Sequence, residues 1–516
     1  MALKRKSLFY ILVPLVLVLF YFGLQWWAKA SLEDFLERKL PNHISLLYEQ
    51  VDINILKGSI SFTKPDIQIF GKHQDSLVLM LHAKSVDLEN LKYWKLINSD
   101  EIHLDGLVVS HPDITLYQPD TTQKNKDRVI GLLKPILIEN VEITNANLKR
   151  IDSSKDTVLS LDSLFVQISK WETNADLINK KLPFTYGPFE LGFENLFFKV
   201  GEYENLVVDK FHVEDKQLEI KNIRLWTKHS RSELSQLISV ERDHVDLTVP
   251  EFTLSKVEVG YARDSVFLNT ESGLIKGLKL DIYRDKNLPD DLNAKILYGK
   301  LLKDLPFKIA LRKLEIDASE VVYEEAVRSR NNAGLLKFEE LAGTIKHISN
   351  LENEKNDLEI SLTSQLMGDG KLELNWSFNV QDPEQRFIAS GSVGNLNTAT
   401  LNNFLRPNLR VSVEGEIQKM YFTISGDQFV TNGDVKMRYE DFKFQVLDKE
   451  EAKIKKILTF LGNLFVSDGS KADEEGYRYG NINNVQRNTN KSFFNYLWIS
   501  LQDGILDVLS GDGKKD

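Results

Sequence analysis

The sequence has no cysteine among its 516 residues. Thiol catalysis, zinc–thiolate sites and disulfides are therefore excluded, and stability must come from burial and backbone pairing. The 75 acidic and 65 basic residues give a net charge of -10, without a long block of either sign. Because nucleic-acid binding needs a basic stripe, no nucleic-acid partner is expected.

Motifs that carry catalysis are also missing. The nine histidines form no His-Glu-x-x-His pair, and there is no phosphate-binding Gly-x-x-x-x-Gly-Lys and no Gly-x-Ser-x-Gly elbow. His103, Asp105, His111 and Asp113 could gather as a metal or acid–base cluster, but solvent-facing residues near a turn are the simpler interpretation. We therefore expect no enzyme activity, no catalytic residue, no metal and no cofactor.

One long apolar run is present, at the N-terminus. Lys4, Arg5 and Lys6 precede an uncharged, largely apolar stretch from Leu8 to Trp27. A helix rises about 1.5 Å per residue, so this stretch would extend roughly 30 Å, the thickness of the hydrocarbon core of a bilayer. The basic triplet stays cytoplasmic under the positive-inside rule, which predicts a single-pass anchor over residues 1–30 and export of the rest.

An alternative for the same segment is a cleaved signal peptide. Ala28-Lys29-Ala30 has the small-x-small form that signal peptidases accept. The apolar stretch is longer than the usual signal core, and Trp26 and Trp27 directly before the site are unusual there, so an anchor is the favoured interpretation.

Most of the remaining chain alternates apolar and polar residues. Val257–Tyr261, Leu372–Val380 and Phe442–Val446 show this period of two, which predicts short strands with one apolar face. Turn residues such as Gly368-Asp-Gly370 and Asn432-Gly433 separate the runs. We therefore expect a mainly β chain of antiparallel meanders.

One eight-residue pattern recurs. Leu104–His111, Ile138–Asn145 and Leu311–Ala318 align with each other, and Phe193–Phe198 fits the start of the pattern. The spacings between copies are unequal, which excludes a propeller or a strict solenoid and favours strand modules with variable insertions.

Helices are expected at a few places only. Residues 174–181 and 230–240 are interpreted as helical inserts. Near the C-terminus, residues 449–465 and the segment that begins at Phe493 have apolar residues at helical spacing, which predicts two amphipathic helices. Gly504 interrupts the second one, and the polar stretch 467–490 between them is expected to be mobile.

The apolar rows on the strands are the remaining candidates for function. With few helices to cover them, either two sheets close on each other or one long curved sheet presents an open apolar channel. Candidate groove residues are Ile143, Ile316, Leu374, Trp376, Phe378, Phe422, Phe442 and Phe444. Candidates for a distal contact with a membrane or a partner are Phe493, Phe494, Leu497, Trp498 and Leu501.

Together these features resemble the AsmA-like family of diderm envelope proteins, relatives of the repeating β-groove lipid transporters. The residues that carry the resemblance are the segment Tyr48–Ile69 after the anchor and a C-terminal module that contains Gly394-Asn-Leu-Asn, Phe422-Thr-Ile-Ser-Gly and Gly433-Asp-Val-Lys. The resemblance implies an inner-membrane helix, an elongated, twisted antiparallel sheet with an apolar groove, and a role in lipid movement or outer-membrane homeostasis.

The expected organisation is an anchor (1–30), a β-groove region with short helical inserts (31–390), an AsmA-like β module (391–448) and a C-terminal part of amphipathic helices and polar chain (449–516). The chain would lie in the inner membrane with its bulk in the periplasm, and would bind or transfer phospholipid or another acyl-chain lipid. The alternative is a non-enzymatic structural or assembly factor that recruits envelope proteins and has closed β-sandwiches.

Overall fold

The computed structural model describes residues 18–34, 36, 40, 43–71, 76–99, 101–118, 134–178, 180, 182–262, 265–328, 330, 332–447 and 472–510. The structure is mainly β, as the sequence predicted, with 25 strands in the described residues. It divides into two compact units, unit 1 (Met1–Lys199 and Val207–Asp215) and unit 2 (Val200–Leu206 and Lys216–Asp516). This division falls inside the stretch 31–390, where the sequence predicted no boundary.

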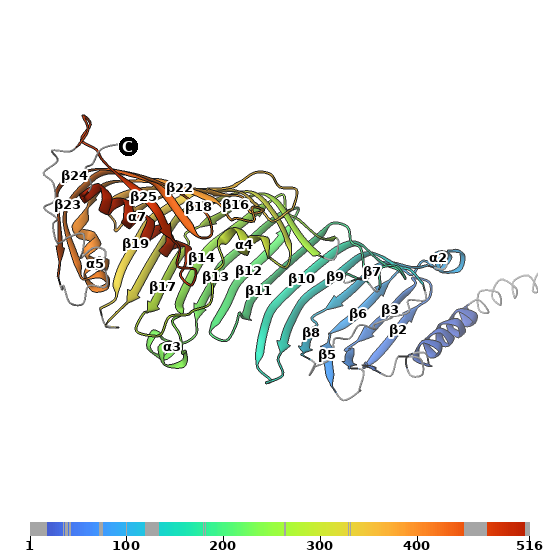
Figure 1. Ribbon diagram of the computed structural model, residues 1–516. Coiled ribbons are helices and arrows are strands. Elements are labelled where there is room, and N and C mark those ends of the chain that lie inside the picture. The colour runs from blue at the N-terminus through green and yellow to red at the C-terminus, as the bar shows by residue number, and fades with distance from the viewer. Residues whose placement is uncertain are drawn as a thin grey trace, which may run out of the picture. The chain divides into compact units, whose positions relative to one another are not determined.

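Unit 1 is built from short strands followed by long ones, coloured blue to cyan in Figure 1. One short helix, α2 (Tyr93–Asn98), is inserted between β6 and β7. The strands are β1 (Ile44–Leu47), β2 (Gln50–Asn54), β3 (Ser59–Thr63), β4 (Asp66–Phe70), β5 (Leu77–His82), β6 (Ser85–Glu89), β7 (Ile102–Ser110), β8 (Asp113–Tyr117), β9 (Ile136–Ile151), β10 (Thr157–Thr173) and β11 (Phe189–Lys199). Strand β12 (Glu204–Glu214) spans the division between the units.

Unit 2 contains the other strands: β13 (Gln217–Thr227), β14 (Asp243–Ser255), β15 (Glu258–Ala262), β16 (Ser265–Lys276), β17 (Lys279–Asp285), β18 (Lys308–Ala326), β19 (Gly334–Ser349), β20 (Leu358–Leu366), β21 (Gly370–Phe378), β22 (Phe387–Asn397), β23 (Val411–Gly426), β24 (Val430–Val446) and β25 (Arg478–Gln486). In the described part of this unit the helices are α3 (Arg231–Leu237), α4 (Tyr298–Lys303), η1 (Thr398–Leu401), α5 (Asn402–Leu409) and α7 (Phe493–Ser510).

The expected anchor, Leu8 to Trp27, lies partly outside the described residues. Residues 18–34 are helical. In the part of the chain that the structure describes, no helix combines the length and the hydropathy needed to cross a membrane.

Strand pairing is mixed, so the expectation of a purely antiparallel sheet was wrong. Most neighbours are antiparallel, but β7 and β8 run parallel to β9, and β16 and β17 run parallel to β18. Parallel neighbours need a crossover connection of a dozen or more residues, and the chain between β8 and β9 and between β17 and β18 is long enough for one. Both units therefore repeat one arrangement. In each, two consecutive strands pair, one after the other, with the same long strand.

The recurrent eight-residue pattern marks these parallel pairs. Leu104 of β7 lies opposite Ile138 of β9, so two copies of the pattern lie side by side in register. The eighth residue of each aligned copy has a positive φ: 49° at His111, 51° at Asn145 and 49° at Ala318. An extra residue of this kind in a strand is a β-bulge, which shifts the alternation of side chains between the two faces of the sheet by one position. The apolar side chains of a long strand thereby stay on one face.

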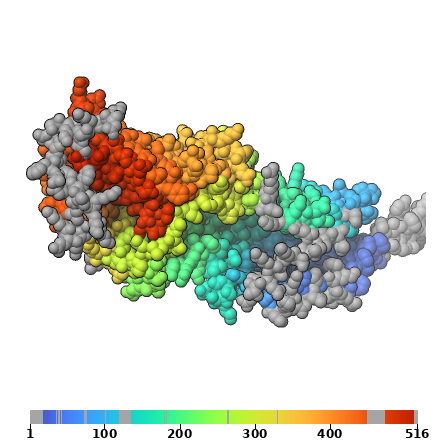
Figure 2. All heavy atoms as spheres, viewed as in Figure 1, coloured from blue at the N-terminus to red at the C-terminus, as the bar shows by residue number. Residues whose placement is uncertain are grey.

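Burial is uneven along the chain. The C-terminal part of unit 2 has one cluster of 23 buried apolar residues, whereas the two other clusters contain four and three. Helix α7 packs against β23, β24 and β25, and α5 packs against β18, β19 and β23. In Figure 2 the red residues of α7 lie against the orange strands. Two helices therefore seal this core.

The predicted helices fared differently. Helix α3 confirms the insert at 230–240, and Ser230 and Glu233 form a capping box at its start. The insert at 174–181 was wrong, because its described residues form turns. The helix predicted at 449–465 lies outside the described residues. The polar stretch was expected to be mobile, but its residues 478–486 form β25, paired with β24. The last predicted helix is confirmed as α7.

Candidate functional site

In unit 1, apolar side chains form uninterrupted rows across the paired strands. One row crosses seven strands as Val51, Phe62, Val86, Val109, Ile143, Val166 and Leu191. The neighbouring row is Ile53, Ile60, Leu88, Leu107, Val141, Ile168 and Phe189. Only Val51 and Val141 are buried, and the other twelve side chains are half-buried. We call the surface formed by these two rows the unit 1 apolar face.

The opposite face of the same strands is polar. The row between the two apolar rows points the other way and reads Asp52, Ser61, Asp87, Val108, Glu142, Gln167 and Glu190. Successive residues of a strand alternate between faces, so this contrast marks a sheet that is apolar on one side only. A half-buried apolar surface of this extent is typical of a binding surface.

Unit 2 has the same construction on a longer scale. One row crosses eleven strands as Leu218, Leu254, Gly273, Leu314, Ile345, Ile360, Trp376, Ala389, Ile424, Gly433 and Ile482. The next row is Ile220, Phe252, Ile275, Ile316, Gly343, Leu362, Leu374, Gly391, Phe422, Val435 and Gly480. No polar side chain interrupts either row. These two rows form the unit 2 apolar face.

Helix α7 lies directly on the last strands of the unit 2 apolar face. Two glycines make this close approach possible. A Cβ at Gly480 would lie 2.5 Å from the carbonyl oxygen of Gly504, and one at Gly504 would lie 2.5 Å from Cγ2 of Val435. The glycine that looks like an interruption in the sequence of the helix is therefore its contact with the sheet.

The candidate groove residues are found in two environments. Ile143 and Ile316 are half-buried members of the apolar rows of unit 1 and unit 2, respectively. The other six belong to the sealed C-terminal core or pack against it. Phe378, Phe422 and Phe442 are buried there, whereas Leu374, Trp376 and Phe444 are partly buried against it. The sequence predicted groove positions for these six, and it could not show that helices cover that part of the sheet.

The candidates for a distal contact all lie on α7, but not on one exposed face. Phe493 is buried, and its ring stacks on that of Trp376 with centroids 4.4 Å apart. Leu497 and Leu501 are half-buried against the core. Phe494 and Trp498 are exposed, at 61% and 38% of their surface. Only these two are free to meet another molecule.

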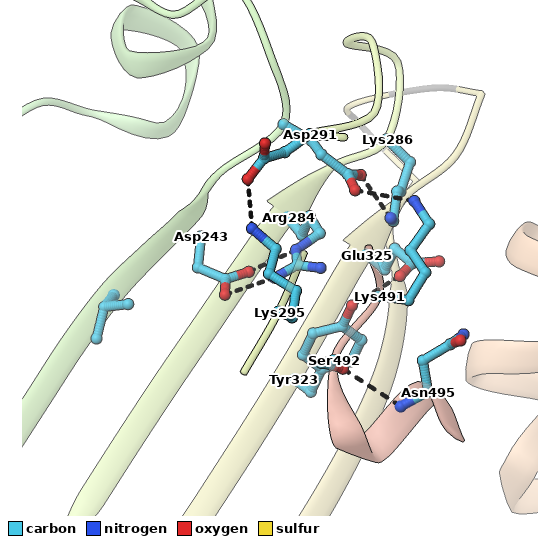
Figure 3. A network of polar contacts seen from close by, with 12 residues as sticks. Asp243, Arg284, Lys286, Asp291, Lys295, Tyr323, Glu325, Lys491, Ser492 and Asn495 are labelled. Atoms are coloured by element: carbon cyan, nitrogen blue, oxygen red, sulfur yellow. Dashed lines mark hydrogen bonds and ion pairs between the residues drawn. The ribbon is translucent and has the colours of Figure 1, made fainter. Parts of the chain in front are cut away.

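A network of ion pairs joins the crossover before β18 to the chain before α7 (Figure 3). The buried carboxylate of Glu241 pairs with Nζ of Lys286 at 2.5 Å and with Nζ of Lys491 at 3.0 Å. Lys491 also pairs with Asp290 at 2.7 Å. Burial opposes the charged form of Lys491, but its hydrogen bonds to Asp290 and Glu241 outweigh burial, so the pKa of Lys491 is raised. The sequence showed no sign of this link, because Glu241 and Lys491 are 250 positions apart.

A second pair of the network belongs to neighbouring strands. The guanidinium of Arg284 on β17 donates two hydrogen bonds of 2.6 Å to the carboxylate of Asp243 on β14. Burial disfavours the charged guanidinium, yet Asp243 more than compensates and the pKa of Arg284 rises. These charges are matched within the protein, so they serve to hold the segments together.

Two other polar clusters lie in unit 1, among the described residues. His103 pairs with Glu139 at 2.9 Å and Asp105 with Lys92 at 2.6 Å, so the acid–base cluster considered from the sequence is not assembled. Among the described residues, Glu190, His212 and Glu214 have ligand atoms within 4.8 Å of one another. His212 is hydrogen-bonded to Glu190 at 3.0 Å, and no further feature there points to a metal.

The arrangement of the described residues can therefore shield hydrocarbon, because its dominant features are two one-sided apolar faces. Comparison with known proteins adds no assignment, since no protein-family model and no curated protein matches the chain.

Proposed function

We propose that this chain is a membrane-tethered, non-enzymatic protein of the cell envelope that holds the acyl chains of phospholipid on its apolar faces and transfers lipid between envelope membranes. Its resemblance to the AsmA-like family and the basic triplet before Leu8 support an inner-membrane anchor and a periplasmic location. The construction expected on this proposal is the repeating β-groove.

One observation carries the proposal: the unit 1 apolar face continues across seven strands while twelve of its fourteen side chains stay half-buried. An apolar surface left in water is unfavourable, and each acyl methylene placed on it would be stabilised by about 0.8 kcal/mol. A structural scaffold has no need for such a surface, whereas a carrier of acyl chains does.

Native mass spectrometry of the purified full chain tests the proposal. We expect bound phospholipid, and we expect Val109→Asp, in the middle of an apolar row, to reduce the bound lipid several-fold. Val108→Asp is the matched control, since it adds the same charge to the same strand on the polar face. A folded wild-type chain that carries no lipid and takes none up would rule the proposal out.

The second candidate is a structural or assembly factor, and the sealed core of 23 buried residues in unit 2 favours it. On that alternative, Val109→Asp and Val108→Asp would differ in thermal stability, and no lipid would be bound to either variant or to the wild type.

A further inference from the structure

Four large apolar side chains form an exposed patch on unit 2. Tyr298 and Leu301 lie one turn apart on α4, and Phe494 and Trp498 lie one turn apart on α7. Between 38% and 61% of each side chain is exposed. The rings of Tyr298 and Phe494 are in contact, with centroids 6.2 Å apart, so the two pairs form one surface. We call these four residues the α4–α7 patch.

The two halves of the patch are held together by the structure around them. The backbone N–H of Lys295, three residues before α4, donates to the carbonyl of Thr489 at 2.8 Å. Arg487 donates from its guanidinium to the carbonyl of Lys295 at 2.5 Å. The Lys491 pairs with Glu241 and Asp290 brace the same junction, and Figure 3 shows Lys491 beside the crossover. The patch is therefore preformed, and it does not need to fold on contact.

The patch is continuous with the unit 2 apolar face. Tyr298 contacts the ring of Trp376 with centroids 5.7 Å apart, and it contacts Phe493 at 6.1 Å. Trp376 is itself a member of an eleven-strand apolar row. The patch therefore borders the point where α7 covers this row.

The composition of the patch fits a bilayer surface. Tyrosine and tryptophan present an apolar body with a polar tip, which suits the boundary between head groups and acyl chains. Lys303 is exposed on the last turn of α4 and can meet anionic head groups, whereas the ammonium of Lys300 pairs with Asp304 at 2.6 Å. A buried protein interface would instead tend to exclude such lysines.

We propose that the α4–α7 patch docks on a bilayer containing anionic phospholipid. Because the anchor is at the other end of the sequence, this contact would be the protein's second membrane contact.

The test uses the full chain reconstituted in nanodiscs and mixed with separate vesicles of phosphatidylcholine and phosphatidylglycerol. Co-flotation of nanodisc with vesicle is expected for the wild type. We expect the double substitution Phe494→Ser with Trp498→Ser to weaken it roughly tenfold, equivalent to about 1.4 kcal/mol. Phe429→Ser is the matched control, because Phe429 is 58% exposed in the turn between β23 and β24.

Each outcome decides the proposal. The proposal would be overturned if wild-type nanodiscs did not float with the vesicles, or if Phe429→Ser weakened co-flotation as much as the double substitution. Equal binding to vesicles of pure phosphatidylcholine would also overturn it. Circular dichroism confirms that the variants fold. Native mass spectrometry distinguishes docking at the patch from the proposed lipid carriage. The double variant should retain the lipid bound on unit 1. Vesicle binding by a wild-type chain that carries no lipid would refute only the proposed function.

Discussion

The ring of Phe493 on α7 stacks on the ring of Trp376 on β21, with centroids 4.4 Å apart and an angle of 13° between their planes. The sequence suggested a groove for Trp376 and a distal contact for Phe493, but the two side chains cover each other. This contact marks where the unit 2 apolar face becomes a sealed core.

Removal of the Phe493 ring should loosen the seal. Phe493→Ala removes a buried aromatic side chain, and we expect it to lower the local stability of β21–β25 by about 3 kcal/mol. Hydrogen exchange of the backbone amides measures this loss, and tryptophan emission should shift to the red as Trp376 meets water. Phe494→Ala is the control, since Phe494 is exposed, and its effect should stay within about 0.5 kcal/mol. Equal effects of the two substitutions would contradict the packing of α7.

The glycine contact between α7 and β25 makes a second prediction. A Cβ at Gly480 would lie 2.5 Å from both the carbonyl oxygen of Gly504 and the backbone nitrogen of Val508. Backbone atoms, unlike a flexible side chain, cannot relieve the clash by rotating away. Gly480→Ala should therefore displace α7 from the sheet and destabilise this region by about 1 to 3 kcal/mol.

Thermal unfolding monitored by circular dichroism tests this prediction. Gly201→Ala is the comparison, since the nearest atom to its Cβ would be 3.8 Å away, an ordinary contact. An alanine at Gly480 that leaves the unfolding midpoint unchanged would show that α7 does not lie where the structure puts it.

Acid should weaken unit 2 through Asp285. This buried carboxylate accepts hydrogen bonds from Ser235 at 2.8 Å, Asn287 at 2.8 Å and Arg330 at 2.5 Å. Burial alone raises the pKa of Asp285, but these hydrogen bonds outweigh it and the pKa is lowered below its ordinary value. The stabilisation is therefore complete above the ordinary carboxyl pKa of about 3.9 and is lost as the pH falls through the lowered value.

Asp285→Asn tests that pH dependence. We expect it to cost about 2 kcal/mol at neutral pH, with the difference from the wild type shrinking below roughly pH 4. Urea denaturation over a series of pH values gives the comparison. Asp246→Asn breaks an exposed pair with Arg224 and should cost less than about 1 kcal/mol. A deficit for Asp285→Asn that does not shrink in acid would argue against the lowered pKa.

Much of the fold could be predicted from the alternation of apolar and polar residues. Leu372–Val380 reads as a strand because every second residue is apolar, which gives the segment one apolar face. Strand β21 lies at this place in the structure. The choice of parallel partners could not be predicted, because no local pattern in the sequence records which strands a long connection brings together. Strand β25 was missed since Arg478–Gln486 is largely polar and is ordered by pairing with β24 and by α7 above it.

The sequence predicted apolar rows on the strands, but it did not show which parts of those rows are covered. Phe378, Phe422 and Ile143 have the same pattern in the sequence, yet helices cover the first two and leave the third half-exposed. Which part of an apolar face is covered depends on where α5 and α7 dock. The docking of α7 depends on Gly480 and Gly504, whose role appears only when the helix and the sheet meet.

The most direct test of the central claim is photo-crosslinking to lipid from adjacent positions on one strand. A benzophenone amino acid is placed at Ile143, on the unit 1 apolar face, or at Glu142, on the polar face of the same strand, in the full chain expressed in its membrane. After illumination, mass spectrometry of the purified protein should find phospholipid attached at position 143 and not at position 142. Equal labelling at the two positions, or a folded protein with no lipid at position 143, would contradict the account.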